Sequence, residues 1–189
     1  HIQKQVWHLA EVYEKLVLPP APLLSALMTD CLRDKKDLSK GAKYNNFGIH
    51  GAGSANAADA LSAIDKQVFN EKHTSLKELI SALDSDFYHH EDLRLALAEA
   101  SPKVGNDDDS VDRYLSYLFE RFASACESYG KTSRGGILRP GTGSAMYYVW
   151  LTQGYAGMRE PVVGATAEGR QKGKPLGANL SPTQGTKVR

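Results

Sequence analysis

The sequence has little cysteine, no long apolar run and almost no net charge. Its 189 residues include 2 cysteines, and the formal net charge is +1. Two cysteines exclude a disulfide framework and offer no metal-ligand spacing, which is typical of a reducing, cytoplasmic compartment. No apolar stretch approaches the roughly 18 residues that a membrane span requires. A charge near zero gives no field that would attract nucleic acid or an anionic membrane.

The first residues contain neither a start methionine nor a signal peptide. The chain begins with His1, and HIQKQVWHLAEVYEKL has the periodicity of an amphipathic helix. An apolar content of 41% and a charged content of 24% are ordinary for a globular domain. We therefore expect residues 1–189 to be a single, partial domain taken from a longer protein.

Apolar periodicity predicts that residues 1–130 are mainly helical. Pro19 and Pro20 end the first expected helix, over 3–17. A strand is expected within 44–51, where a short apolar run lies between glycines. Five further helices are expected: from Pro22 to about 36, from a cap at Ser54 to about 72, from a capping box at Ser75 and Glu78, over 90–100, and from a cap at Asp109 or Ser110 to Gly130.

Residues 131–189 contain glycine-rich loops around one β-prone run, MYYVWLT at 146–152. Helices that feed few strands indicate a helix-rich α/β fold. Residues 159–189 carry an excess of cations, and a solvated basic loop explains this excess better than a phosphate site does. The charged residues concerned are Arg159, Arg170, Lys172, Lys174, Lys187 and Arg189, against Glu160 and Glu168.

Several motifs that suggest a bound cofactor have a simpler structural explanation. The glycines at 51–53 and 141–143 lack the third glycine of a dinucleotide fingerprint, and tight turns account for them. The aspartates at 107–109 lack the spacing of a calcium loop and suit a helix N-terminus. No zinc-ligand spacing and no G-x-S-x-G motif occurs. We expect no metal, no bound cofactor, and buried packing roles for Cys31 and Cys126.

Four collinear motifs carry more information than any of these. The first, at 19–64, contains PPAPLLSALMTDC, GAKYNNFGIHG and AADALSAI; SPKVGNDDDSVD (101–112), RGGILRPGTGS (134–144) and VGATAEGRQKGKPLGANLSP (163–182) follow. Together they resemble the glycyl radical enzymes of the pyruvate formate-lyase type. The resemblance implies a helix-rich portion of a pyruvate formate-lyase-type α/β barrel with few short strands.

In that family a cysteine loop and a glycine loop meet at the barrel centre. The cysteine becomes a thiyl radical, and a separate iron–sulfur activating enzyme generates the glycyl radical with S-adenosylmethionine. The sequence contains no R-V-x-G-Y-like motif, and Cys31 resembles a helical, non-catalytic cysteine. We therefore expect no catalytic residue in this chain and no activity of the isolated chain. The implied partners are a small-molecule substrate, the activating enzyme and a second subunit of a homodimer.

The resemblance also places the end of the 44–51 strand and the turn after 134–136 near substrate. His50 is expected to donate a proton or to hydrogen-bond a carboxylate, and a histidine bonded to backbone is the alternative. For Thr142 and Ser144 the alternative is capping of the turn. The candidate pocket residues are Asn46, Phe47, His50, Thr142, Ser144 and Tyr147.

The reaction is less well defined than the family. His50 stands where the diol-dehydratase branch tends to have glutamine, and residues 142–145 and 177–180 also depart from that branch. These departures favour cleavage of a C–C bond of a small anaerobic metabolite, by a decarboxylase or an acyl-transferring lyase, with C–heteroatom cleavage kept open. Two other hypotheses remain: a stand-alone binding or scaffold module, and one chain of a split enzyme.

Overall fold

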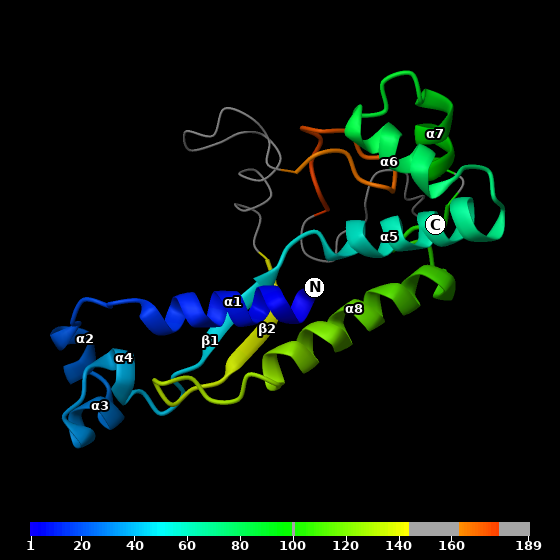
Figure 1. The fold of residues 1–189 in the computed structure, drawn as a ribbon. Coiled ribbons are helices and arrows are strands. Elements are labelled where there is room, and N and C mark those ends of the chain that lie inside the picture. The colour runs from blue at the N-terminus through cyan, green and yellow to red at the C-terminus, as the bar shows by residue number, and fades with distance from the viewer. Residues whose placement is uncertain (100, 144–162, 178–189) are drawn as a thin grey trace. The chain divides into compact units, whose positions relative to one another are not determined.

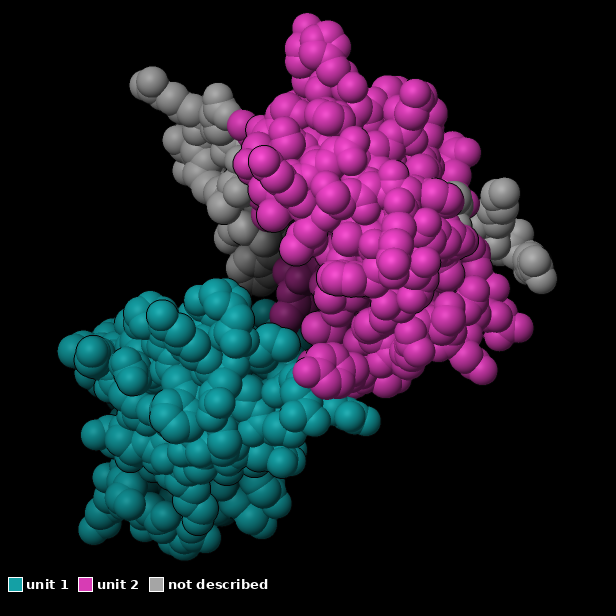
Figure 2. Space-filling view, turned by 45° about the vertical axis from the view of Figure 1, so that its right-hand side comes forward, with its two compact units in different colours: residues 1–50, 119–141 teal, residues 51–118, 142–189 magenta. Residues whose placement is uncertain are grey.

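The computed structural model describes residues 1–99, 101–143 and 163–177. The described residues form helices and one two-stranded sheet (Figure 1). They belong to two compact units (Figure 2): unit 1 contains residues 1–50 and 119–141, and unit 2 contains residues 51–118 and 142–189. No described helix is long and apolar enough to cross a membrane.

Unit 1 packs helices against one face of the sheet. Its core joins Val6 and Ala10 of the first helix to Ile49 and Leu138 of the two strands, with Cys126 beside them. Burial of these apolar side chains is the main force that holds the unit together. Its elements are α1 (Ile2–Lys15), α2 (Pro22–Ala26), α3 (Thr29–Asp34), α4 (Leu38–Gly41), all but the last residue of β1 (Phe47–Gly51) and of β2 (Leu138–Thr142), and the C-terminal part of α8 (Asp109–Glu127).

The two strands run parallel. The Phe47 amide donates to the Ile137 carbonyl at 3.0 Å, and the Gly143 amide donates to the Gly51 carbonyl at 2.8 Å. Both strands therefore advance in the same direction, which requires a crossover connection such as the helical segment between them. This register places Phe47 opposite Leu138 and His50 opposite Gly141.

Arg134 closes the C-terminal end of α1. Its Nη2 donates to the carbonyls of Tyr13 and Leu16, at 3.3 and 2.6 Å, beside the bond that the Leu16 amide donates to the Tyr13 carbonyl at 3.2 Å, so carbonyls at the helix end have donors. The guanidinium lies 4.4 Å from the centre of the Tyr13 ring, and that ring stacks on Phe47 at 3.9 Å. The helix thus ends at Lys15, two residues earlier than periodicity predicts.

Unit 2 contains α5 (Ser54–Ile64), the π-helix η1 (Asp65–Asn70), α6 (Leu76–Asp84), α7 (Glu91–Glu99) and the N-terminal part of α8. One core cluster joins α5, η1, α6 and α7 through side chains such as Leu79 and Leu97. A second joins α5 to α8 through Ala55, Ala58 and Val111.

Cys31 and Cys126, both in unit 1, are buried and free, as the sequence predicts, and burial raises the pKa of the Cys126 thiol.

Several predicted boundaries are wrong, for local reasons. The helix expected from Pro22 is two helices, because Met28 is extended between them. Gly53, in the left-handed region at φ 69°, precedes α5, so Ser54 is its first residue and not its cap. The cap of α8 is Asp108, whose Oδ1 accepts from the Ser110 amide at 2.9 Å. By contrast, Ser75 does cap α6, by accepting from the Glu78 amide at 3.1 Å.

The region after residue 130 also differs from the prediction. Residues 138–142, expected to be glycine-rich loop, form β2. The β-prone run at 146–152 lies outside the described residues.

Asp37 organises the turn that follows α3, and acid is expected to weaken it. Its carboxylate accepts from the Ala21 and Ser39 amides, at 2.8 and 3.0 Å, and these bonds hold the pKa of Asp37 far below its ordinary value of 3.8. The stabilisation is therefore complete above that value and is lost as pH falls toward the lower folded pKa. Asp37→Asn should unfold at lower urea concentration near pH 6 and lose less stability between pH 4 and pH 2. Urea titrations across this range test the prediction, and equal losses of stability between pH 4 and pH 2 in Asp37→Asn and the parent would contradict it.

Candidate substrate-facing site

The two faces of the sheet differ in what covers them. Phe47 and Ile49 alternate with Gly48 and His50 along β1, and successive strand residues point to opposite faces. Ile49 is buried with α1 and α8, whereas His50 is exposed. In barrels built of parallel strands and helices, the helices cover the outside and the other face looks inward. By analogy with such barrels, the face that carries the exposed His50 is called the inward face from here on.

Glycine lines this face on both strands. A Cβ atom at Gly48 would lie 3.4 Å from Nε2 of His50, and one at Gly141 would lie 3.6 Å from Cδ2 of the same ring. The imidazole therefore rests against bare backbone of its own strand and of the neighbouring strand. Within the described part of the chain its ring makes no hydrogen bond, so its nitrogens are available to a ligand.

Arg139 belongs to the same face and was missed by sequence reasoning. It alternates with the buried Leu138 on β2, is exposed, and lies opposite Gly48 in the parallel register. Arg139 and His50 are thus diagonal neighbours across two glycines. Only the strand assignment of 138–142 reveals this, because LRPGT has no alternation of apolar and polar residues.

The other pocket candidates lie elsewhere. Asn46 accepts from the Ile137 amide through Oδ1 at 3.1 Å, which joins the starts of the two strands. Phe47 is half-buried in its stack with Tyr13. Thr142 follows the alternation of Leu138, on the opposite face from His50. Ser144 and Tyr147 lie outside the described residues.

The motifs of unit 2 meet in a buried polar network. Glu168 accepts from Asn56 Nδ2 at 2.7 Å and from Thr166 Oγ1 at 2.8 Å. Lys103 Nζ donates to the Glu168 carbonyl at 3.0 Å, and Asp59 accepts from the Val104 amide at 2.7 Å. Desolvation lowers the pKa of Lys103, which is 1% exposed. These motif residues therefore hold α5 and two loops together.

Arg170 corrects the expectation that the C-terminal cations are solvated. It is 3% exposed, and its guanidinium donates to the carbonyls of Gln171 and Lys174 at 3.0 and 2.7 Å and also to that of Gly164. Its Nε donates to Thr166 Oγ1 at 3.0 Å. Burial lowers the pKa of Arg170, but the guanidinium stays charged and its charge is met by backbone dipoles.

Parallel strands with helices on one face, and an open face lined by glycine, histidine and arginine, define a wall segment of an α/β barrel. The chain belongs to the pyruvate formate lyase-like family, which it matches over residues 9–152. Two solved structures agree. A glycyl radical enzyme from Archaeoglobus fulgidus superposes with a TM-score of 0.80 at 29% identity, over 96% of this chain and 23% of that one. The glycerol-bound B12-independent glycerol dehydratase from Clostridium butyricum superposes with a TM-score of 0.77 at 33% identity, over 87% of this chain and 20% of that one.

The names of proteins related in sequence state more specific reactions. The chain is 36% identical to (2S)-3-sulfopropanediol dehydratase from Klebsiella oxytoca over 168 residues, 87% of this chain and 19% of that protein. It is 31% identical to trans-4-hydroxy-L-proline dehydratase from Clostridioides difficile over 88% of this chain and 20% of that protein. The chain is 32% identical to isethionate sulfite-lyase from Desulfovibrio desulfuricans, over 88% of this chain and 19% of that protein. The chain thus spans about a fifth of the length of these relatives.

These names bear on the predicted chemistry. They confirm the resemblance to glycyl radical enzymes and the barrel fold. They do not support the preference for C–C cleavage, because dehydratases break C–O bonds and a sulfite-lyase breaks a C–S bond.

Proposed function

We propose that this chain forms part of the substrate pocket of a glycyl radical enzyme that cleaves a C–O or C–S bond of a small metabolite. The observation that carries the proposal is the inward face of the β1–β2 sheet, where His50 rests on Gly48 and Gly141. The thiyl cysteine and the radical glycine belong to other parts of that enzyme, and a separate activating enzyme installs the radical. Such an enzyme acts as a homodimer.

Arg139 defines the substrate class. A guanidinium offers a planar fork of donors that matches the oxygens of a carboxylate or sulfonate. Sulfopropanediol, hydroxyproline and isethionate, named for three relatives, each carry such a group. In the proposed pocket Arg139 holds the anionic group of the substrate, and in a dehydration His50 donates a hydrogen bond or a proton to the leaving hydroxyl oxygen, which departs as water.

Kinetics of the complete, anaerobically activated enzyme test this proposal. Arg139→Gln should raise KM for a hydroxyalkanesulfonate or hydroxy acid by about tenfold, because it removes a charge-assisted contact made equally in ground and transition states. His50→Gln should lower kcat by about a hundredfold, the low end for a lost proton donor. Substrate consumption, with the glycyl radical quantified by electron paramagnetic resonance, gives both constants.

The control is Lys131→Gln, which removes an exposed cation of the same unit outside the strands and should leave both constants unchanged. A protein that carries the radical but consumes no C–O or C–S substrate contradicts the proposed reaction. Turnover of a neutral diol in preference to anionic substrates, unaffected by Arg139→Gln, contradicts the assignment of Arg139 alone.

A further inference from the structure

Unit 1 exposes large aliphatic side chains between the end of α1 and α3. Val17 is 94% exposed, Leu27 75% and Leu32 65%, and Leu23 and Leu24 are also exposed. Isolated aliphatic residues on a surface need no explanation, but contiguous apolar patches mark interaction sites. The concentration of exposed aliphatic side chains within a stretch of 16 residues (17–32) therefore indicates a surface on which another polypeptide segment packs.

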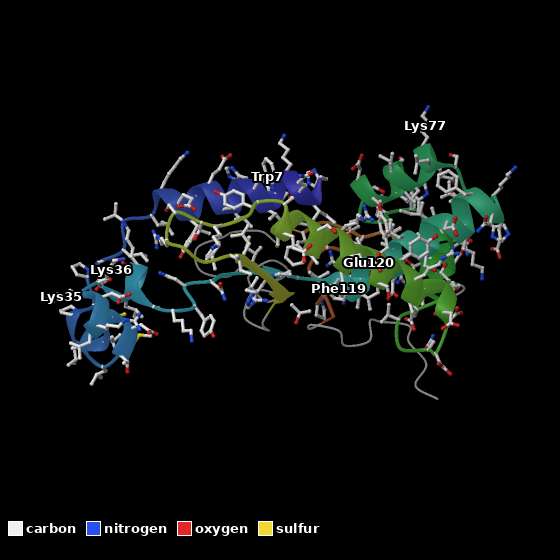
Figure 3. The ribbon with its side chains drawn as sticks, turned by 90° about the horizontal axis from the view of Figure 1, so that it is seen from below. Trp7, Lys35, Lys36, Lys77, Phe119 and Glu120 are labelled. Atoms are coloured by element: carbon white, nitrogen blue, oxygen red, sulfur yellow. The ribbon has the colours of Figure 1, made fainter. Side chains whose placement is uncertain are left out.

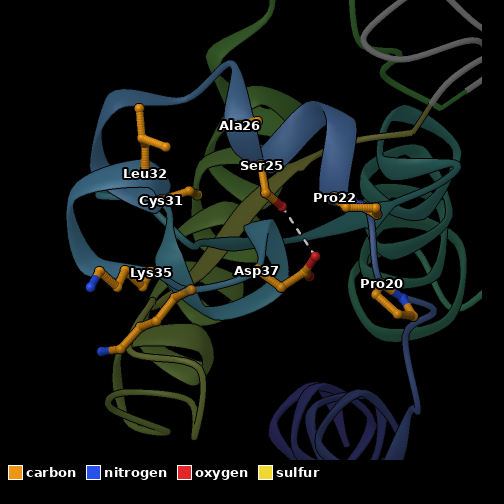
Figure 4. Close-up of a pocket in the computed structure, with 9 residues that line it drawn as sticks. Pro20, Pro22, Ser25, Ala26, Cys31, Leu32, Lys35 and Asp37 are labelled. Atoms are coloured by element: carbon orange, nitrogen blue, oxygen red, sulfur yellow. Dashed lines mark hydrogen bonds between the residues drawn. The ribbon is translucent and has the colours of Figure 1, made fainter.

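The same stretch contains a hollow, called the α2–α3 groove from here on. Its volume is about 380 Å³. Figure 4 shows proline, alanine, leucine and cysteine side chains around it, with charged residues at one side. The lining residues are Pro20, Pro22, Ser25, Ala26, Cys31, Leu32, Lys35, Lys36 and Asp37.

Hydrogen bonds hold the groove in shape without a ligand. Ser25 Oγ donates to Asp37 Oδ2 at 3.1 Å (Figure 4) and accepts from the Leu38 amide at 2.8 Å. Asp37 also binds the Ala21 amide, so the turn before α2 and the turn after α3 are joined. A preformed groove loses little conformational entropy when it is filled, which favours binding.

Three charged residues line the groove, and the carboxylate of one of them, Asp37, already accepts hydrogen bonds from Ser25 and from two backbone amides. Arg33 pairs with Asp30 and Asp34 at 3.3 and 2.7 Å and is therefore compensated locally. Lys35 and Lys36, which line the groove, make no salt bridge in the described part of the chain. Figure 3 shows both at the α3–α4 end of the unit. The complementary occupant is a segment with an apolar side chain and a neighbouring carboxylate.

The comparisons indicate where such a segment comes from. Between 87% and 96% of this chain matches the relatives named above, but the match is 19–23% of their length. A TM-score of 0.80 means that the segment follows the same path inside a chain about four times longer. Some of that remaining polypeptide is available to pack on surfaces that this chain leaves exposed.

We infer that the α2–α3 groove is an interface with the remainder of a pyruvate formate lyase-like polypeptide. An apolar side chain of that remainder fills the groove, and an acidic residue beside it pairs with Lys35 and Lys36. This inference rests on family membership and not on the proposed reaction. Its test uses folding and solubility, so its failure is distinct from failure of the substrate assignment.

The experiment compares Leu32→Glu in two settings. The first is the 189-residue chain. The second is a chimera in which the chain replaces the matching 168 residues of the Klebsiella oxytoca dehydratase. In the isolated chain the new carboxylate is exposed to solvent, so the unfolding temperature should stay unchanged. Binding of an apolar dye should decrease, because one exposed aliphatic side chain is lost. In the chimera the charge is buried against the rest of the barrel, so the unfolding temperature should fall by several degrees.

Two control variants make the outcome decisive. Leu32→Ala should have a smaller effect in the chimera, and Gln5→Glu, which adds the same charge to an exposed position on α1, should have none. A chimera that tolerates Leu32→Glu overturns the inference. So does an isolated chain that forms a dimer split by Leu32→Glu, because a second copy would then be the occupant. If the chimera is insoluble, dye binding that does not respond to Leu32→Glu in the isolated chain still overturns it.

Discussion

Replacing Gly136 with alanine should strongly destabilise unit 1. A Cβ atom there would lie 1.6 Å from the Asn45 carbonyl oxygen and 2.7 Å from the Asn46 nitrogen. Both contacts are with backbone, so no side chain can move aside. The start of β1 must separate from the start of β2, where Ile137 and Phe47 pair. We expect a loss of about 3 kcal/mol or more, at the upper end for overpacking.

Urea unfolding combined with hydrogen exchange of the β1 amides measures this loss. The matched control is Gly164→Ala, because within the described part of the chain no atom lies within 4 Å of its new methyl group and its φ is not positive. The control should stay within about 0.5 kcal/mol of the parent. A Gly136→Ala variant with the same stability as the control would contradict the close packing of the 45–46 peptide against Gly136.

Replacing Arg170 with alanine should cost unit 2 about 3–5 kcal/mol. The substitution removes the guanidinium that donates to the carbonyls of Gly164 and Lys174, leaves the Gln171 carbonyl with only the Lys174 amide, and opens a cavity at a site that is 3% exposed. Arg170→Lys keeps the charge but cannot reach several carbonyls with one nitrogen, so it should recover only part of the loss. Thermal and urea unfolding, followed by exchange of the amides of residues 163–177, give the values.

Lys174→Ala provides the comparison for Arg170. It removes an exposed side chain while leaving the Lys174 carbonyl in place as an acceptor, and it should change stability by less than about 0.5 kcal/mol. If Arg170→Ala changes the free energy of unfolding no more than Lys174→Ala does, the guanidinium is solvated, as its sequence context first indicated. The buried network would then not depend on Arg170.

Local periodicity predicted the elements that local interactions stabilise. The apolar faces of α1 and α8 are visible in the sequence because their contacts recur every three or four residues. The cap at Ser75 depends on an amide three residues away. The short apolar run between glycines at 44–51 placed His50 at the end of a strand, which is the part of the candidate site that the sequence could reveal.

Elements that depend on distant partners were not predicted. Nothing in LRPGT indicates a strand, because β2 exists through a parallel pairing with residues about 90 positions earlier in the chain. Arg139 could not be assigned to the face of His50 without that pairing. The burial of Arg170 was missed for the same reason, since its surroundings are a folded loop and not a helical or strand repeat.

By itself, the sequence determined the family, the helix-rich α/β class and the positions of most helices, because ordered motifs and apolar periodicity are properties of neighbouring residues. Only the tertiary structure decided which face of the sheet is open, that Arg139 shares it with His50, and that the motifs around Lys103 and Glu168 form one buried network. The physical reason is that strand register, burial and desolvation arise between segments far apart in the chain, and no local pattern specifies which segments meet.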